Sequence, residues 1–166
     1  GMPPALGQLL RGELESSTSF EQGLTKMQAL LTNSLCDAKA PELRGLHVVA
    51  GAAGSGKSML ACRLAQQAAK RYGADTVAVI SYCDKKPGAW NQQQLFALTT
   101  GVQPYRAKDQ GGLEALLDEL DGYDCVIIDT GSDFSRSELS YIQRLCPTTV
   151  HLAIASDVSE YAAKAQ

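Results

Sequence analysis

Several features that would place this chain of 166 residues in a familiar class are missing from its sequence. No apolar run approaches the roughly 20 residues that a membrane-spanning helix needs, and the first residues form no signal-peptide pattern. The net charge is −3, so no basic surplus favours binding to DNA or to anionic lipid. The five cysteines show no Cys-x-x-Cys spacing, which argues against a zinc site and against a disulfide framework. These absences predict a cytoplasmic protein that binds no DNA directly and reaches membranes only through partners.

The composition that is present is typical of a globular domain. Hydrophobic residues make up 45% of the chain and charged residues 20%, both of which are ordinary proportions. A chain of about 150 residues buries roughly 70% of its unfolded surface. The length therefore suits one domain with a substantial core.

Short apolar runs alternate with helical patterns along the chain, which is typical of an α/β fold. Strands are expected at residues 46–50, 76–81, 125–129 and 150–155, and a short edge strand, limited by Pro104, at 102–107. Helices are expected at residues 59–72, 89–100 and 113–120, and from a capping box at Ser135 to Pro147. Because the main strands are apolar on both faces, we predict a three-layer α/β sandwich with a mostly parallel sheet.

Residues 51–58 read Gly-Ala-Ala-Gly-Ser-Gly-Lys-Ser, which fits the pattern of a phosphate-binding loop, or Walker A motif, between a strand and a helix. Its glycines let the backbone wrap around phosphate oxygens, and the amides that open the helix point at the anion. Lys57 is expected to reach the β- and γ-phosphates, and the Ser58 hydroxyl to bind Mg²⁺. The expected nucleotide-binding residues of the loop are Gly51, Ala52, Ala53, Gly54, Ser55, Gly56, Lys57 and Ser58.

Two carboxylates are expected beside this loop. Asp129 ends a predicted apolar strand, which is the Walker B position that holds Mg²⁺ directly or through water. Gly131 follows it, and its amide is a candidate contact for a γ-phosphate. Asp84 lies just past another strand at the same edge of the sheet, and is a candidate for orienting the attacking water or a hydrated Mg²⁺. Asp84 and Lys57 are the two expected catalytic residues. A solvated turn explains Asp84 equally well.

Several other polar side chains are expected to serve the fold. Histidines inside strands are more often satisfied structural residues than catalytic ones, and arginines or glutamines on a helix usually face solvent. The residues concerned are His47, His151, Arg136, Arg144, Gln92, Gln93 and Gln94. Lys85 and Lys86 follow Asp84 and are candidates for offsetting phosphate charge.

The N-terminal and C-terminal parts of the chain differ from this central domain. Residues 19–22 resemble a capping box that opens an amphipathic helix running to about Leu35. Residues 1–44 are therefore assigned to an N-terminal helical extension, and residues 45–166 to the P-loop nucleotide-binding domain. A further helix is expected to begin near Asp157, and the domain is expected to be incomplete at its C-terminus.

Three segments resemble the motifs of the signal-recognition-particle type GTPases, and in particular those of the flagellar member FlhF. Residues 46–65 are similar to the first motif, in which the phosphate loop is followed by Ala-Cys-Arg-Leu-Ala. Residues 77–95 resemble the second, an Asp-Thr-Tyr-Arg stretch that leads to Glu-Gln-Leu, and residues 124–131 resemble the third, Asp-Thr-Ala-Gly-Arg. The preceding helix is similar to the N-terminal extension of such proteins, so the resemblance covers most of residues 20–156.

The chain departs from this family where hydrolysis is carried out. In the family, the aspartate and arginine of the second motif serve hydrolysis, and two paired G domains complete the sites. Here one extra residue separates Asp84 from Leu95, no arginine follows Asp84, and Gln93 replaces a glutamate. The third motif has Ser132 and Asp133 in place of its arginine, and the guanine-specifying Thr-Lys-x-Asp motif is absent.

The resemblance implies a protein that binds GTP (or ATP) with Mg²⁺, hydrolyses it weakly or with a partner's help, and acts in flagellar assembly, flagellar placement or protein targeting. A P-loop small-molecule kinase is the enzyme alternative, because Gly-Ser-Gly-Lys-Ser loops are common there. A third interpretation is a degenerate G domain that serves as an assembly module. Pairing of G domains and the apolar strand at residues 150–155 predict a homodimer or a partner complex, through the nucleotide face or the sheet edge.

Overall fold

The computed structural model describes residues 7–8, 10–12, 15, 17–35, 42–85 and 88–155. The chain divides into two compact units, Gly1–Glu42 and Leu43–Gln166. None of the helices among the described residues is long and apolar enough to cross a membrane.

In the first unit, helix α2 spans Phe20–Leu35, as expected. The Ser19 hydroxyl accepts a hydrogen bond from the Gln22 amide at 3.2 Å. The Gln22 side chain, however, accepts from the Thr18 hydroxyl at 2.7 Å, so it caps one residue earlier than a regular capping box. The apolar side chains Phe20 and Leu24 are 85% and 41% exposed within this unit.

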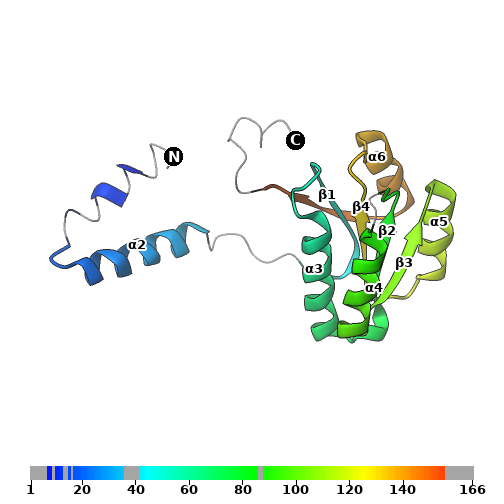
Figure 1. Cartoon of the computed structure of the whole chain (residues 1–166), viewed down its shortest axis with the longest axis horizontal. Helices are drawn as coiled ribbons and strands as arrows, with labels where there is room; N and C mark the ends of the chain where they lie inside the picture. The colour runs from blue at the N-terminus through cyan, green and yellow to red at the C-terminus, as the bar shows by residue number, and fades with distance from the viewer. Residues whose placement is uncertain are drawn as a thin grey trace. The chain divides into compact units, whose positions relative to one another are not determined.

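The second unit is a three-layer α/β sandwich (Figure 1). Its elements, in chain order, are β1 (Gly45–Gly51), α3 (Lys57–Tyr72), the 3₁₀ turn η1 (Ala74–Thr76), β2 (Val77–Tyr82), α4 (Ala89–Thr100), β3 (Gln103–Ala107), α5 (Gln110–Glu119), β4 (Cys125–Thr130), α6 (Arg136–Leu145) and β5 (Thr148–Ala153). The sheet has the strand order β3-β2-β4-β1-β5, and all neighbouring strands are parallel. The predicted fold class is therefore confirmed.

Each face of the sheet is covered by two helices, and each pair encloses its own core. On one face, α3 and Phe96 of α4 pack on Val49, Val79 and Ile127. On the other face, α5 and α6 pack on strand residues such as Ile80 and Ile128. Every residue of β2 and β4 is buried, as expected for central strands that are apolar on both faces.

The edges of the sheet explain where the expected boundaries and patterns were wrong. β5 starts at Thr148, two residues earlier than expected. It was expected to be buried on both faces, but much of it is exposed, because it is an edge strand and no described strand pairs with its outer side. Val150 and Leu152 are accordingly 39% and 45% exposed. β3 is the edge strand that Pro104 predicts. The helix expected to begin near Asp157 lies outside the described residues.

The parallel arrangement decides where a functional site lies. Because all strands run the same way, the loops that follow β1, β2 and β4 meet at one edge of the sheet. These three loops carry the phosphate-loop residues, Asp84 and Gly131 respectively.

Candidate functional site

The phosphate loop connects β1 directly to α3. Gly56 occupies the residue before the helix with φ 88° and ψ 19°, a left-handed conformation that glycine adopts without strain. No side chain caps the helix, and the helix starts at Lys57, two residues earlier than expected. The first amides of α3 therefore remain available to an anion, and the helix dipole favours negative charge at this end.

Lys57 crosses the loop from the first turn of α3. Its side chain is only 8% exposed, and its ammonium donates hydrogen bonds to the carbonyl oxygens of Gly51 and Ala52, both at 2.9 Å. A cation thus sits over the loop, and it must exchange these two carbonyls for phosphate oxygens when an anion enters.

The loop, the end of β2 and the end of β4 enclose one cavity of about 440 Å³. It gathers predicted site residues from three separate stretches of the sequence. Its lining includes Ala53, Gly54, Gly56, Lys57, Ser58, Asp84, Gln92, Thr130 and Gly131. Gly51 and Ala52 instead contact the Lys57 ammonium and line a neighbouring groove beside β5. The Ser55 hydroxyl, inside the loop, is buried and has no hydrogen-bond partner among the described residues.

Asp129 precedes the lining residue Thr130 at the end of β4 and is buried, with only 2% of its surface exposed. One carboxylate oxygen, Oδ2, accepts a hydrogen bond from Gln93 Nε2 at 3.2 Å, while Oδ1 has no partner among the described residues. Burial raises the pKa of Asp129, and the nearby Asp84 charge raises it further, against the opposing effects of Ser58, Gln93 and Lys57. A buried carboxylate with an unsatisfied oxygen beside a serine hydroxyl fits the oxygen-ligand preference of Mg²⁺.

Gln93 contacts Asp129 from inside the fold. It was expected to face solvent, yet it is 3% exposed, donates to Asp129, and leaves its own Oε1 without a described partner. Its position in the sequence indicates burial, because Gln93 lies three residues before Phe96, on the same face of the helix, and Phe96 packs into the core. A polar residue on the inward side of a helix indicates a buried polar partner.

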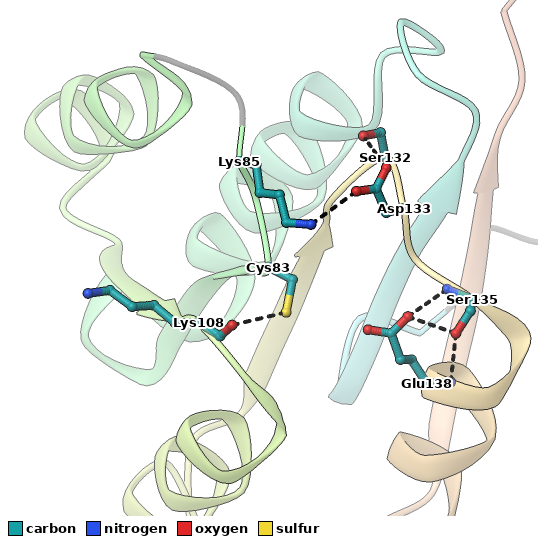
Figure 2. Close-up of polar contacts among 7 residues, drawn as sticks. All are labelled: Cys83, Lys85, Lys108, Ser132, Asp133, Ser135 and Glu138. Carbon is teal, nitrogen blue, oxygen red and sulfur yellow. Dashed lines mark hydrogen bonds and ion pairs between the residues drawn. The ribbon is translucent and has the colours of Figure 1, made fainter.

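The ends of β2 and β4 are held together in a strained turn. Cys83 has φ 51° and is the one non-glycine residue of the described chain with positive φ. Its amide donates to Ala107 at 2.9 Å and its thiol to the Lys108 carbonyl at 3.3 Å, as Figure 2 shows for the thiol. The Gly131 amide donates to the Tyr82 carbonyl at 3.0 Å, so a contact to a γ-phosphate would require this bond to open. A Cβ on Gly131 would lie 2.6 Å from the Cys83 oxygen, which explains the glycine.

The remaining candidates are engaged in the fold. Lys85 points to Asp133, and their charged atoms lie 3.3 Å apart (Figure 2), while Lys86 lies outside the described residues. His47 Nδ1 and His151 Nε2 lie 3.0 Å apart across β1 and β5, while the buried His47 Nε2 has no hydrogen-bond partner among the described residues. The expected capping box of Ser135 and Glu138 is present (Figure 2). Arg136 and Arg144 are exposed, as expected of arginines that face solvent on a helix.

Solved structures with the same arrangement of elements include FlhF complexed with GTP and Mg²⁺, which is 19% identical and superposes with a TM-score of 0.61 over 96% of this chain. FtsY from Elizabethkingia anophelis is 20% identical with a TM-score of 0.59 over 85% of the chain. The 54 kDa signal recognition particle protein from Aeropyrum pernix K1, in complex with GDP, is 18% identical with a TM-score of 0.54, also over 85%. The chain has the fold of the signal-recognition-particle type GTPases.

This chain spans 65%, 50% and 36% of those three proteins, respectively. The sequence itself matches no protein-family model and no curated protein. The expected resemblance to the signal-recognition-particle type fold is thus confirmed by structure.

Proposed function

We propose that residues 51–58 bind a nucleoside triphosphate, GTP in preference to ATP, together with Mg²⁺. The observation that carries the proposal is that the uncapped first turn of α3 and Lys57 line one cavity, and that the buried Asp129, with an unsatisfied oxygen, lies beside the lining residue Ser58. The preference for guanine rests on the relatives, since FlhF was solved with GTP and Mg²⁺ and the particle protein with GDP.

In this proposal different residues bind the phosphates and the Mg²⁺ ion. The α3 amides and Lys57 hold the β- and γ-phosphates, and Ser58 and Asp129 hold Mg²⁺, directly or through water. The bound cation neutralises charge on the phosphate oxygens. Gly131 lines the same cavity, and its amide binds the γ-phosphate in this proposal once its bond to the Tyr82 carbonyl opens.

Hydrolysis, in this account, is slow or depends on a partner. Asp84 faces the same cavity as Lys57 and positions a water, whose oxygen bonds to the γ-phosphorus as the bond to the β–γ bridging oxygen breaks. No arginine follows Asp84, and Lys85 cannot replace one, because it has no bidentate fork and is already paired with Asp133. Charge that develops on the phosphoryl oxygens is therefore poorly stabilised by this chain alone.

Titration calorimetry with GTP and Mg²⁺ tests the binding site. Lys57→Ala should weaken binding by about tenfold or more, since it removes charge-assisted contacts worth about 1.5–3 kcal/mol. Lys70→Ala, in the last turn of the same helix, is the matched control and should leave the affinity unchanged. Equal affinities for the wild-type protein and Lys57→Ala would refute the phosphate-loop assignment.

We further propose that the chain acts in flagellar assembly or placement, or in protein targeting, from the cytoplasm, with residues 1–44 as a helical extension of the nucleotide-binding domain. Two copies, or this chain and a partner protein, then pair through the nucleotide face or through β5, whose apolar residues are exposed. Light scattering with and without GTP tests the pairing. A monomer under both conditions, at micromolar concentration, would refute self-association.

A phosphoryl-transfer enzyme is the second candidate, and one cavity favours it. A space of about 830 Å³ adjoins the phosphate site, shares Asp84 and Gly131 with it, and is lined by Arg106. An acceptor hydroxyl there would attack the γ-phosphorus in place of water and leave as a phosphate ester, with the nucleoside diphosphate as the other product. Release of diphosphate that depends on an added small hydroxyl compound, rather than on time alone, would favour this function over hydrolysis.

A further inference from the structure

A separate groove lies at the opposite edge of the sheet from the phosphate loop. It has a volume of about 750 Å³ and is bounded by the C-terminal ends of α5 and α6 and by the first residues of β1 and β4. Its floor is apolar and nearly buried, with Leu46, Leu120 and Val126 only 3–7% exposed. Leu117 of α5 and Leu145 of α6 form its walls, and Leu145 is 37% exposed. An aliphatic surface thus lies open between two helices.

The charged residues that line the groove are all acidic. They are Glu114 and Asp118 on α5 and Asp121 just after it, and no lysine, arginine or histidine is among the lining residues. Glu114 accepts a hydrogen bond from the Tyr141 hydroxyl at 3.0 Å. The carboxylates of Asp118 and Asp121 make no hydrogen bond or ion pair with another described residue. The acidic rim is therefore not neutralised by the part of the chain that the structure describes.

The direction of α5 makes this arrangement unfavourable for the isolated protein. A helix C-terminus carries partial negative charge and is stabilised by basic residues, with each such contact worth about 0.3–1 kcal/mol. The last turn of α5 contains no basic residue, and Asp118 and Glu119 both lie in it. The negative charges of the carboxylates and the negative end of the helix dipole therefore reinforce one another beside the apolar floor of the groove. A cation that reaches this rim relieves the repulsion.

We infer that this groove docks an amphipathic basic helix of another protein. The occupant's apolar side chains would lie on Leu46, Leu120 and Val126, and its lysines or arginines would face the acidic rim, as in other helix-in-groove complexes. A second copy of this chain and its own helix α2 are both less complementary to the groove. A second copy brings a net charge of −3, and α2 carries only one acid and one base, Glu21 and Lys26. The groove lies away from the phosphate site, so this docking is independent of the proposed nucleotide binding.

The test uses the full chain and two fluorescent peptides of the same composition, each about 18 residues or five helical turns long. The first has leucines along one helical face and lysines on the other, and the second has the same residues with the leucines distributed around the helix. Fluorescence anisotropy should show binding of the first peptide at least about tenfold tighter than of the second, because only the first buries an apolar stripe while pairing its charges.

Two protein variants locate the interaction. The triple variant Glu114→Gln, Asp118→Asn and Asp121→Asn should weaken binding of the first peptide by about tenfold or more, since it removes three facing charges. Glu119→Gln is the matched control, because Glu119 lies on the same helix but does not line the groove, and its effect should be less than about twofold. The triple variant removes repulsion at a helix C-terminus, so it should unfold at the same or a higher urea concentration than the wild type.

Four results would overturn the inference. Equal affinities for the two peptides would mean that charge alone is recognised, without the apolar floor. An unchanged affinity in the triple variant, or amide chemical shifts that move only at the phosphate loop, would place the peptide elsewhere. A dimer in light scattering that the triple variant dissociates would make a second copy of this chain the occupant.

Discussion

Replacing Asp129 by asparagine should change stability and cation-dependent binding in opposite directions. The carboxylate is 2% exposed, its Oδ1 has no described partner, and burial raises its pKa above the ordinary value of 3.8. An unsatisfied buried polar atom costs about 1–3 kcal/mol. Ser58, Gln93 and Lys57 offset part of this cost here. The asparagine side chain keeps an acceptor for Gln93 and removes the charge. We expect a gain of about 1 kcal/mol, or roughly 2–4 °C in Tm for a chain of this size.

The same substitution should weaken GTP binding in the presence of Mg²⁺ by about 10- to 100-fold, since a charged contact worth about 1.5–3 kcal/mol is lost. Urea unfolding and calorimetry measure the two effects. Asp124→Asn is the control just before the same strand, where Asp124 pairs with Arg44 at 3.0 Å, so it should lower stability slightly and leave nucleotide binding intact. A less stable Asp129→Asn protein that binds Mg²⁺ and GTP normally would refute the reasoning.

The pH dependence of this stability difference follows from the sign of the shift. The native state binds a proton more readily than the unfolded state, because the native pKa of Asp129 is raised. The ionised carboxylate therefore destabilises the protein at neutral pH, and the destabilisation disappears as pH falls through the native pKa towards 3.8. The advantage of Asp129→Asn should be largest near pH 7 and vanish in acid.

Further outcomes can be measured on the same protein. Gly131→Ala should cost about 1–3 kcal/mol in urea unfolding, because its Cβ would lie 2.6 Å from the Cys83 oxygen; an unchanged midpoint would contradict this. Burial lowers the pKa values of His47 and His151, so the unfolded state binds more protons and stability should fall as pH drops through 6.5. His151→Gln should reduce this fall, and an identical pH profile would argue against the histidine pair as its source. GTP turnover by the chain alone should stay below about one per second, because a missing arginine commonly costs 10³-fold or more; faster release of phosphate would restore a catalytic role to Lys85 or an unrecognised group.

The central part of the fold was predictable because its signals are local. Strands β1, β2 and β4 are continuous apolar runs, and residues 51–58 impose both a turn and a helix start. Parallel topology then brings the ends of these strands to one edge without further information. This is why Asp84, which is distant in sequence from Lys57 and Ser58, was expected at the same edge of the sheet, and all three residues line one cavity there.

The parts that were missed depend on contacts between distant residues. Gln93 is a polar residue of a type that usually faces solvent on a helix, and only its hydrogen bond to the buried Asp129, distant in sequence, explains its buried position. The left-handed turn at Cys83 is held by bonds to β3, and no local pattern at residue 83 predicts it. The edge position of β5 changes the burial of Val150, and neighbouring strands rather than its own sequence decide that position.

The measurement that tests the central claim most directly is displacement of a fluorescent GTP analogue from the wild-type chain in the presence of Mg²⁺. The phosphate loop predicts saturable binding at one site per chain, with displacement by unlabelled GTP. The proposed guanine preference, which rests on the relatives, predicts less effective displacement by ATP. Removal of Mg²⁺ by a chelator should weaken the binding, because Ser58 and Asp129 then lose the cation they share. No change in fluorescence up to millimolar nucleotide, with the protein shown to be folded, would contradict the account.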